Sequence, residues 1–163
     1  MDYKKIDKQL YNDHFFTNFC LGYRTGNTSG GMSKDFMMHD ADYFKRLCEI
    51  LEPKNILCLG RLTFECVFET LIGKDEPKPE GFNRKYNDFI EMYGNNPITA
   101  KIGDNRRVKI FPLAHPGAMG TLNRVRGVKI DFPKDATTEE KNAIRLESQK
   151  RDWEKILAAQ TTD

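Results

Sequence analysis

The segment 55–72, NILCLGRLTFECVFETLI, constrains the fold most, because it reads as an apolar strand that turns at one glycine into a helix. Asn55–Leu59 is a nearly continuous apolar run, which is typical of a strand buried on both faces in a parallel sheet. Gly60 then lets the chain turn directly into a helix predicted over Leu62–Ile72. This order indicates an α/β layered fold with a mostly parallel central sheet flanked by helices.

The remaining predicted elements fit the same class of fold. A lone glycine such as Gly60 is no phosphate-binding signature, since neither glycine-rich fingerprint surrounds it. We predict a short helix or arm over 2–12, strands over Phe15–Leu21, Ile98–Ile102 and Arg107–Leu113, helices over Asp40–Leu51, Phe82–Tyr93 and from Thr138 to about Ala159, and loops over Gly22–Ser33 and Lys74–Gly81.

Length and composition indicate one folded domain over residues 1–163. Hydrophobic residues make up 39% of the chain and charged residues 31%, which favours a core with a well-solvated exterior. There is no apolar run of about 18 residues and no apolar stretch at the start, so we expect neither a membrane helix nor a signal peptide. The expected location is therefore cytoplasmic.

The cysteines and histidines predict no metal site and no cofactor. Cys20, Cys48, Cys58 and Cys66 lie in apolar contexts without a C-x-x-C pair, so buried free thiols are the expected state. The same spacing does not suit an iron–sulfur cluster.

The segment 108–124, VKIFPLAHPGAMGTLNR, contains the first candidate site residue. An apolar strand runs into a His-Pro-Gly turn, and a strand end can hold a polar side chain rigidly while the next loop meets a ligand. We therefore single out His115. The alternative is a packed or capped structural histidine.

The segment 14–24, HFFTNFCLGYR, contains the second candidate, because Thr17 and Asn18 interrupt a run that otherwise reads as a buried strand. A side-chain amide both donates and accepts hydrogen bonds, which suits reading the edge of a small heterocycle. Asn18, with Thr17 beside it, is the predicted ligand-binding residue.

The net charge of +2 is too even to identify a nucleic-acid binder, but the charge around His115 is mostly positive. Two interpretations stay open, a positive potential beside the site and a solvated hairpin edge carrying protective charges. The cations concerned are Arg106, Arg107, Lys109, Arg124, Arg126 and Lys129.

Taken together, strand-Thr17-Asn18, strand-Gly60-helix and strand-His115-Pro116-Gly117 resemble the uracil-DNA glycosylase superfamily over most of Phe15–Trp153. The resemblance implies a uracil-DNA glycosylase-like fold, with Asn18 reading the uracil edge. It also implies that His115 hydrogen-bonds the uracil carbonyl as negative charge builds during cleavage of the glycosidic bond.

The same resemblance assigns DNA contacts to the residues after His115. Met119 takes the position of the apolar wedge that fills the gap left by a flipped nucleotide, with Leu122 as the second choice. Arg124 and Arg126 are the expected phosphate contacts. Gly117 stands where the family often has a serine, so only its backbone amide remains for a phosphate.

The sequence departs from the family upstream of Asn18, which only seventeen residues precede. The family's first motif, which positions the attacking water, has no visible equivalent. In the family that motif follows a strand inside the parallel sheet, and its loss would leave unpaired backbone groups. Another strand, a second subunit or a separate N-terminal piece would have to complete the sheet, unless the chain is a fragment.

The sequence is compatible with three functions. The first is hydrolytic excision of uracil or a related base from DNA in base-excision repair, which would make the protein a uracil-DNA glycosylase-type hydrolase. The second is a catalytically reduced homologue that binds DNA or a protein partner through the same groove. The third is an unrelated α/β module that binds a small nucleotide with its phosphate near His115.

Overall fold

The computed structural model describes residues 15–21, 32–104, 106–128 and 130–160. The predicted helix or arm over 2–12 and most of the predicted loop at Gly22–Ser33 lie outside these ranges. None of the helices within them is long and apolar enough to cross a membrane. The described elements are α2 (Lys34–Met38), α3 (Ala41–Leu51), β1 (Asn55–Leu59), α4 (Arg61–Leu71), α5 (Tyr86–Tyr93), β2 (Ile98–Ile102), β3 (Arg106–Leu113), α6 (Ala118–Gly127) and α7 (Thr138–Gln160).

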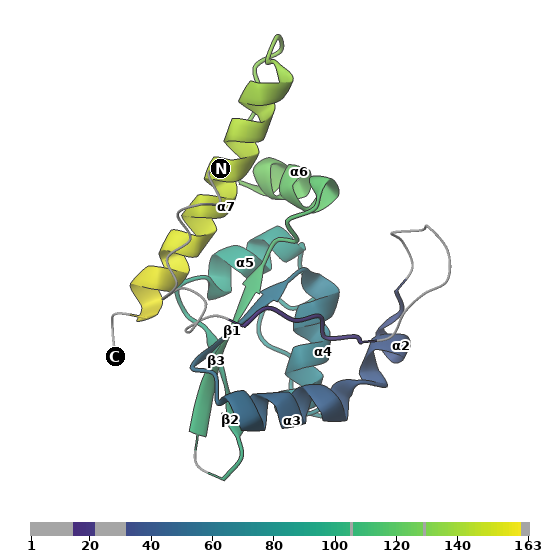
Figure 1. Cartoon of the computed structure of the whole chain (residues 1–163). Coiled ribbons are helices and arrows are strands. Elements are labelled where there is room, and N and C mark those ends of the chain that lie inside the picture. The colour runs from purple at the N-terminus through teal and green to yellow at the C-terminus, as the bar shows by residue number, and fades with distance from the viewer. Residues whose placement is uncertain (1–14, 22–31, 105, 129, 161–163) are drawn as a thin grey trace.

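The described strands form one mixed sheet in the order β1-β3-β2 (Figure 1). β1 pairs with β3 in parallel, from Asn55 opposite Lys109 to Leu59 opposite Leu113. β2 pairs with β3 antiparallel, as the predicted hairpin requires. The α/β class is thus confirmed. A mostly parallel sheet is not confirmed, because only one of the two pairs is parallel.

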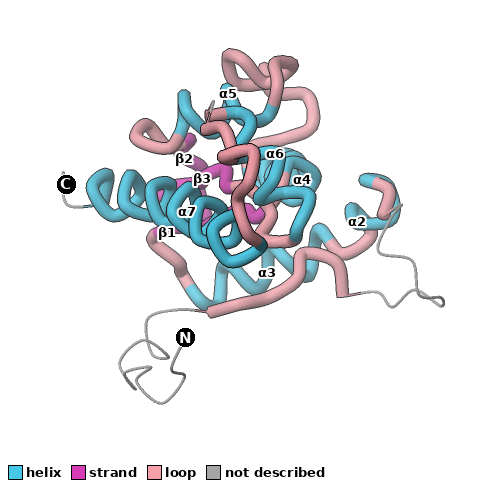
Figure 2. Tube along the Cα trace, turned by 90° about the horizontal axis from the view of Figure 1, so that it is seen from above, coloured by secondary structure: helices cyan, strands magenta, loops and turns pink. Residues whose placement is uncertain are grey.

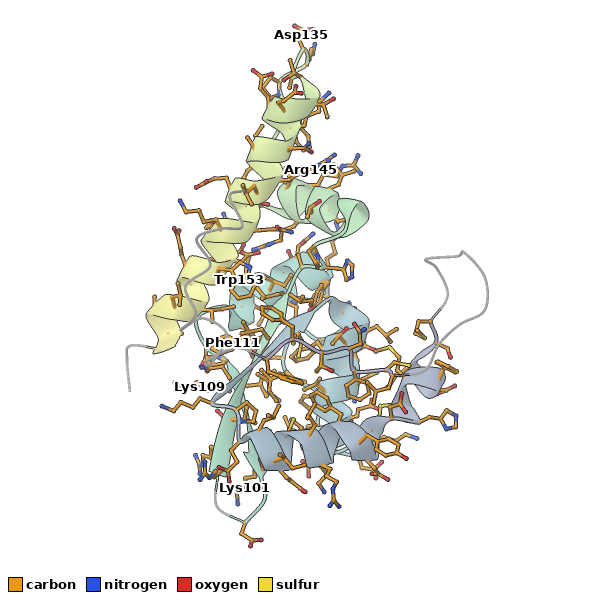
Figure 3. All side chains as sticks on the ribbon, in the orientation of Figure 1. Lys101, Lys109, Phe111, Asp135, Arg145 and Trp153 are labelled. Atoms are coloured by element: carbon orange, nitrogen blue, oxygen red, sulfur yellow. The ribbon has the colours of Figure 1, made fainter. Side chains whose placement is uncertain are left out.

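Helices cover both faces of this sheet (Figures 1 and 2). One face packs against α3, α4 and α5 around a core that contains Phe64, Phe89 and Ile110. The other face meets the C-terminal half of α7, where Ile156 packs on Phe111 and Leu113. The N-terminal half of α7 projects away from the sheet, with Asp135 near the tip of this projection (Figure 3).

Local signals in the sequence mark the end of α3 and the starts of α4 and α7, whereas α5 begins at Tyr86 and not at the predicted Phe82. α3 closes at Glu52, whose φ of 48° is left-handed, and Pro53 follows. α4 begins directly after Gly60, which has a φ of 98° that favours glycine. The helix signal near Thr138 corresponds to a reciprocal cap in which Thr137 and Glu140 hydrogen-bond to each other.

The predicted strand at Phe15–Leu21 is wrong: this segment has no ladder partner among the described residues. Phe19 is buried against Phe44 of α3, with ring centroids 4.8 Å apart, whereas Phe15 and Phe16 are 63% and 79% exposed. The segment therefore crosses in front of the helices as extended chain (Figure 1). An apolar run alone does not make a strand, because a strand needs a neighbour for its backbone groups.

β1 has an open outer edge within the described chain. Lys109 N donates to Lys54 O at 2.9 Å and Gly60 N donates to Leu113 O at 2.8 Å. In a parallel strand, the backbone N–H and C=O of one residue point to the same side, and those of the next residue point to the opposite side. The backbone groups of Asn55, Leu57 and Leu59 therefore face away from β3. The edge of β2, by contrast, carries the exposed Thr99 and Lys101, as protected edges do. β1 therefore has the sequence of an interior strand and the position of an edge strand.

Amide hydrogen exchange will test this edge. We expect the Cys58 amide, which faces β3, to exchange far more slowly than the Leu57 amide, which faces outward. The two residues are neighbours on one strand, so global stability cancels from the comparison. Equal protection at both amides, measured by NMR, would show that another strand covers the edge.

Candidate functional site

The candidate site lies where the parallel strands β1 and β3 end. The Leu113 carbonyl accepts hydrogen bonds from the Gly60 amide at 2.8 Å and the Tyr86 hydroxyl at 3.2 Å. Burial raises the pKa of Tyr86 well above its ordinary value, so the hydroxyl stays protonated and continues to donate. The end of β3 is thereby attached to both α4 and α5. Ligands of open α/β sheets bind at this carboxyl edge.

His115 is exposed and lies two residues beyond this attachment. A Cβ on Gly60 would lie 3.5 Å from the His115 Cβ and 3.8 Å from its Cδ2, so the ring rests beside the start of α4. The Gly117 amide donates to His115 Nδ1 at 3.0 Å. A neutral imidazole with an accepting Nδ1 carries its proton on Nε2. His115 therefore presents a hydrogen-bond donor at Nε2.

Two helices begin beside His115, and neither has a side-chain cap. The N-cap residues are Gly60 for α4 and Gly117 for α6. Uncapped N-termini carry free N–H groups and partial positive charge, which favour an anion. The arrangement therefore suits an atom on which negative charge develops, with the Nε2–H of His115 as the directional donor.

Gly120 allows α6 to pack closely against the His115 backbone. A Cβ at this position would lie 2.1 Å from the His115 carbonyl oxygen. The run of small residues after His115 is thus a packing requirement, which the sequence interpretation did not recognise. The helix takes the place of the loop that the resemblance implied, and Leu122 is half-buried on it.

The structure limits what one predicted DNA contact, Gly117, can do, and it does not describe the side chain of another, Met119. The Gly117 amide is already used by His115 Nδ1, so it is not free for a phosphate. The side chain of Met119 lies outside the described part of the chain. Its backbone belongs to the first turn of α6.

Arg124 cannot be a phosphate contact, because its side chain is fully buried. It binds both carboxylate oxygens of Asp152, from Nε at 2.7 Å and Nη2 at 2.6 Å, and Nη2 also donates to Glu91 at 2.6 Å. Burial lowers the pKa of a guanidinium, but Asp152 and Glu91 outweigh it, and the pKa of Arg124 is raised. Arg124 instead joins α5, α6 and α7.

Arg124 does not hold the Glu91 carboxylate alone. Arg151 donates to its Oε1 at 2.5 Å, and Lys155 contacts its Oε2. Burial raises the pKa of Glu91, but the hydrogen bonds from Lys155 and Arg124 prevail and lower it. The carboxylate is therefore ionised at neutral pH.

The predicted basic cluster is divided between the two ends of β3. Arg106 and Arg107 begin the strand, which at eight residues spans about 25 Å, whereas Arg126 lies beyond its other end. Arg106 forms an ion pair with Glu52 at 2.6 Å. Lys129 lies outside the described residues. Of the cluster, the structure leaves Arg126 as the exposed cation on α6, the helix that begins beside His115.

Asn18 and Thr17 are exposed, and the described contacts do not join them to His115. The Thr17 hydroxyl donates to the Asn18 carbonyl at 3.2 Å. Their segment is held at Phe19 by α3 and at Leu21 by Asp40, whose carboxylate accepts from the Leu21 amide at 2.7 Å. The segment that contains Thr17 and Asn18 is thus attached to α3, whereas His115 lies beside the starts of α4 and α6.

A small hollow adjoins the strand ends on the face covered by α7. Its volume is about 70 Å³, far below the roughly 300 Å³ or more of typical ligand pockets. The half-exposed Trp153 forms part of its wall (Figure 3). A whole nucleobase would need more room than this hollow provides. The lining residues are Leu59, Leu113, Ala114, Pro116, Gln149, Asp152 and Trp153.

The cysteines are free, as predicted. Burial raises the pKa of Cys48 and of Cys66 to about 11 and also raises that of Cys58, so these thiols are protonated at neutral pH. Among the described residues, no group of histidines, cysteines and carboxylates could hold a metal ion.

Comparisons of the chain with known proteins gave no match. No protein-family model matches the chain, and neither the curated proteins nor the solved structures contain a match. The functional interpretation consequently depends on the residues themselves.

Replacing Arg124 will separate its structural role from DNA contact. Arg124→Met leaves Asp152 as a buried carboxylate without its cation, so we expect a loss of about 3–5 kcal/mol in the free energy of unfolding. Arg126→Ala removes the same charge from an exposed position and should leave the denaturation midpoint unchanged. Equal midpoints in urea for the two variants would contradict the buried network.

Gly120→Ala tests the contact between α6 and His115. In an ordinary helix interior this change stabilises a protein by roughly 0.5–1 kcal/mol. Here the added Cβ meets the His115 carbonyl, so we expect a loss of roughly 1–3 kcal/mol instead. Thermal or urea unfolding gives the sign directly, and a stabilised variant would rule out the close packing.

Proposed function

We propose that this protein recognises a base in DNA and hydrolyses the N-glycosidic bond of uracil or a related base. The observation that supports this most is the position of His115 at the carboxyl edge of the parallel strands, beside the uncapped starts of α4 and α6. The resemblance of strand-Gly60-helix and strand-His115-Pro116 to uracil-DNA glycosylases points to the same reaction.

The proposed chemistry requires stabilisation of a departing anion. When the bond between the base nitrogen and the sugar carbon breaks, its electron pair goes to the base, and a water oxygen bonds to the sugar. His115 Nε2–H would donate to the base oxygen that gains negative charge, and the two helix starts would add favourable potential. Both hydrogens of the water are retained overall, one on the new hydroxyl and one on the released base.

We further propose that the complete sheet is mostly parallel, with an added strand along the open edge of β1. The outward groups of Leu57 and the uncharged sequence of β1 support this. A second subunit or a separate N-terminal piece would supply it, and its binding would slow exchange of the Leu57 amide, which is expected to be fast in the chain alone. The group that positions the attacking water would come from this strand or from the hollow that Gln149 and Asp152 line.

A second candidate function is DNA or protein binding without catalysis. The hollow of about 70 Å³ and the separate attachment of the Asn18 segment favour this alternative. It uses the same surface around His115. The two functions differ in whether the glycosidic bond is broken.

The deciding experiment is a glycosylase assay on a labelled oligonucleotide with one uracil, as a single strand and as a duplex. We expect excision by the parent and a rate lower by about 10²–10³-fold for His115→Ala, as for loss of one preorganised donor. His39→Ala is the matched control, because His39 is exposed at the end of α2, away from the strand ends.

Each result has a definite meaning. Equal rates for the parent and His115→Ala would remove His115 from the reaction. No excision by the parent, together with salt-sensitive DNA binding, would favour the second candidate function.

A further inference from the structure

Three hydrogen bonds attach the loop before α5, and the first residue of α5, to the start of α4 and the end of β3. Arg61, the residue after Gly60, donates to Arg84 O at 3.0 Å and to Phe82 O. The Tyr86 hydroxyl donates to the end of β3. The bonds from Arg61 engage backbone carbonyls of the loop, and the side chains of Arg84 and Lys85 are exposed.

The first turn of α5, which follows this loop, contacts α6. Asn87 Nδ2 donates to Asn123 O at 2.8 Å, and a Cβ on Gly127 would overlap the Asn87 side chain at 2.2 Å. Arg126 lies between these two contacts in the sequence and is exposed. The start of α5 and the C-terminal half of α6 therefore form one continuous surface.

Three cations lie on this surface without an ion-pair partner among the described residues: Arg84, Lys85 and Arg126. The neighbouring carboxylate of Glu65 is bound by Arg61 at 2.8 Å, and Glu91 is held by Arg124, Arg151 and Lys155. Asp88 in the first turn of α5 and Glu80 are exposed acids nearby, and exposed Asp131 follows Ile130, whose amide donates to Val125 O at the end of α6. Two carboxylates near the cations are thus already neutralised.

We propose that Arg84, Lys85 and Arg126 form a phosphate-contact rim that binds the backbone of a nucleic-acid strand. α6 begins beside His115, and ten helical residues extend about 15 Å, so the rim lies within a few nucleotides of His115. Cations spread over such a length match a repeating row of phosphates. The location of the strand relative to a target base depends on the proposed function, whereas phosphate binding itself does not.

The rim is tested by the salt dependence of DNA binding. The probe is a fluorescent single-stranded oligonucleotide without uracil, and its affinity is measured by anisotropy between 50 and 200 mM salt, a range suggested by the counterion-release relation. For Arg84→Ala with Lys85→Ala we expect the slope of log affinity against log salt to fall by about 1.4. Arg126→Ala should lower it by about 0.7.

Lys101→Ala with Arg107→Ala is the matched control. It also removes two exposed cations, and Lys101 lies on the β2–β3 hairpin, at the end of the molecule away from α6 (Figure 3). The control should keep the parent slope. An equal fall in both double variants, or a parent that shows no salt-dependent binding, would overturn the rim.

The assay distinguishes the rim from the proposed function because its probe has no base to excise. A reduced slope in the rim variants, with no uracil excision by the parent, would retain the rim and reject catalysis. Excision that depends on His115, with an unchanged slope in the rim variants, would retain catalysis and reject the rim.

Discussion

The hydrogen bonds to the Leu113 carbonyl determine the geometry of the candidate site. One oxygen accepts from the Gly60 amide and from the Tyr86 hydroxyl, so the start of α4, the end of β3 and the start of α5 meet at one atom. A buried carbonyl satisfied twice has little freedom to move, since losing either donor would leave polar groups unpaired. This attachment fixes the strand end that leads to His115, and the hydrogen bond from the Gly117 amide orients the His115 ring.

A second constraint acts on α5, α6 and α7. Arg124 binds carboxylates from α5 and α7 while its own backbone belongs to α6, so one buried cation holds three helices together. Such a group cannot also serve a ligand, because removing it from its partners would leave buried charges uncompensated. Any cation that meets a phosphate here must therefore come from the surface. Arg126 on α6 and the loop before α5 carry exposed cations.

The sequence predicted the elements whose signals are local. The uncharged run of β1, Gly60 after it and Pro53 after α3 each act within a few residues, and the structure confirms all three. The strand predicted around Asn18 failed because pairing depends on a partner far away in the chain. Arg124 looked like a surface cation because Asp152 and Glu91, its partners, are 28 and 33 residues away.

The open edge of β1 connects the fold to the chemistry of the proposed function. Parallel strands deliver the loops that follow them to one edge of a sheet. A strand added parallel to β1 would therefore satisfy the outward groups of Leu57 and would place its next loop beside Gly60 and His115. Walls from that loop would enlarge the shallow hollow, and a carboxylate or amide on it would lie where water must be positioned. Under the proposed function, one added neighbour would account for an interior strand at an edge and would complete a site that holds an anion-stabilising donor.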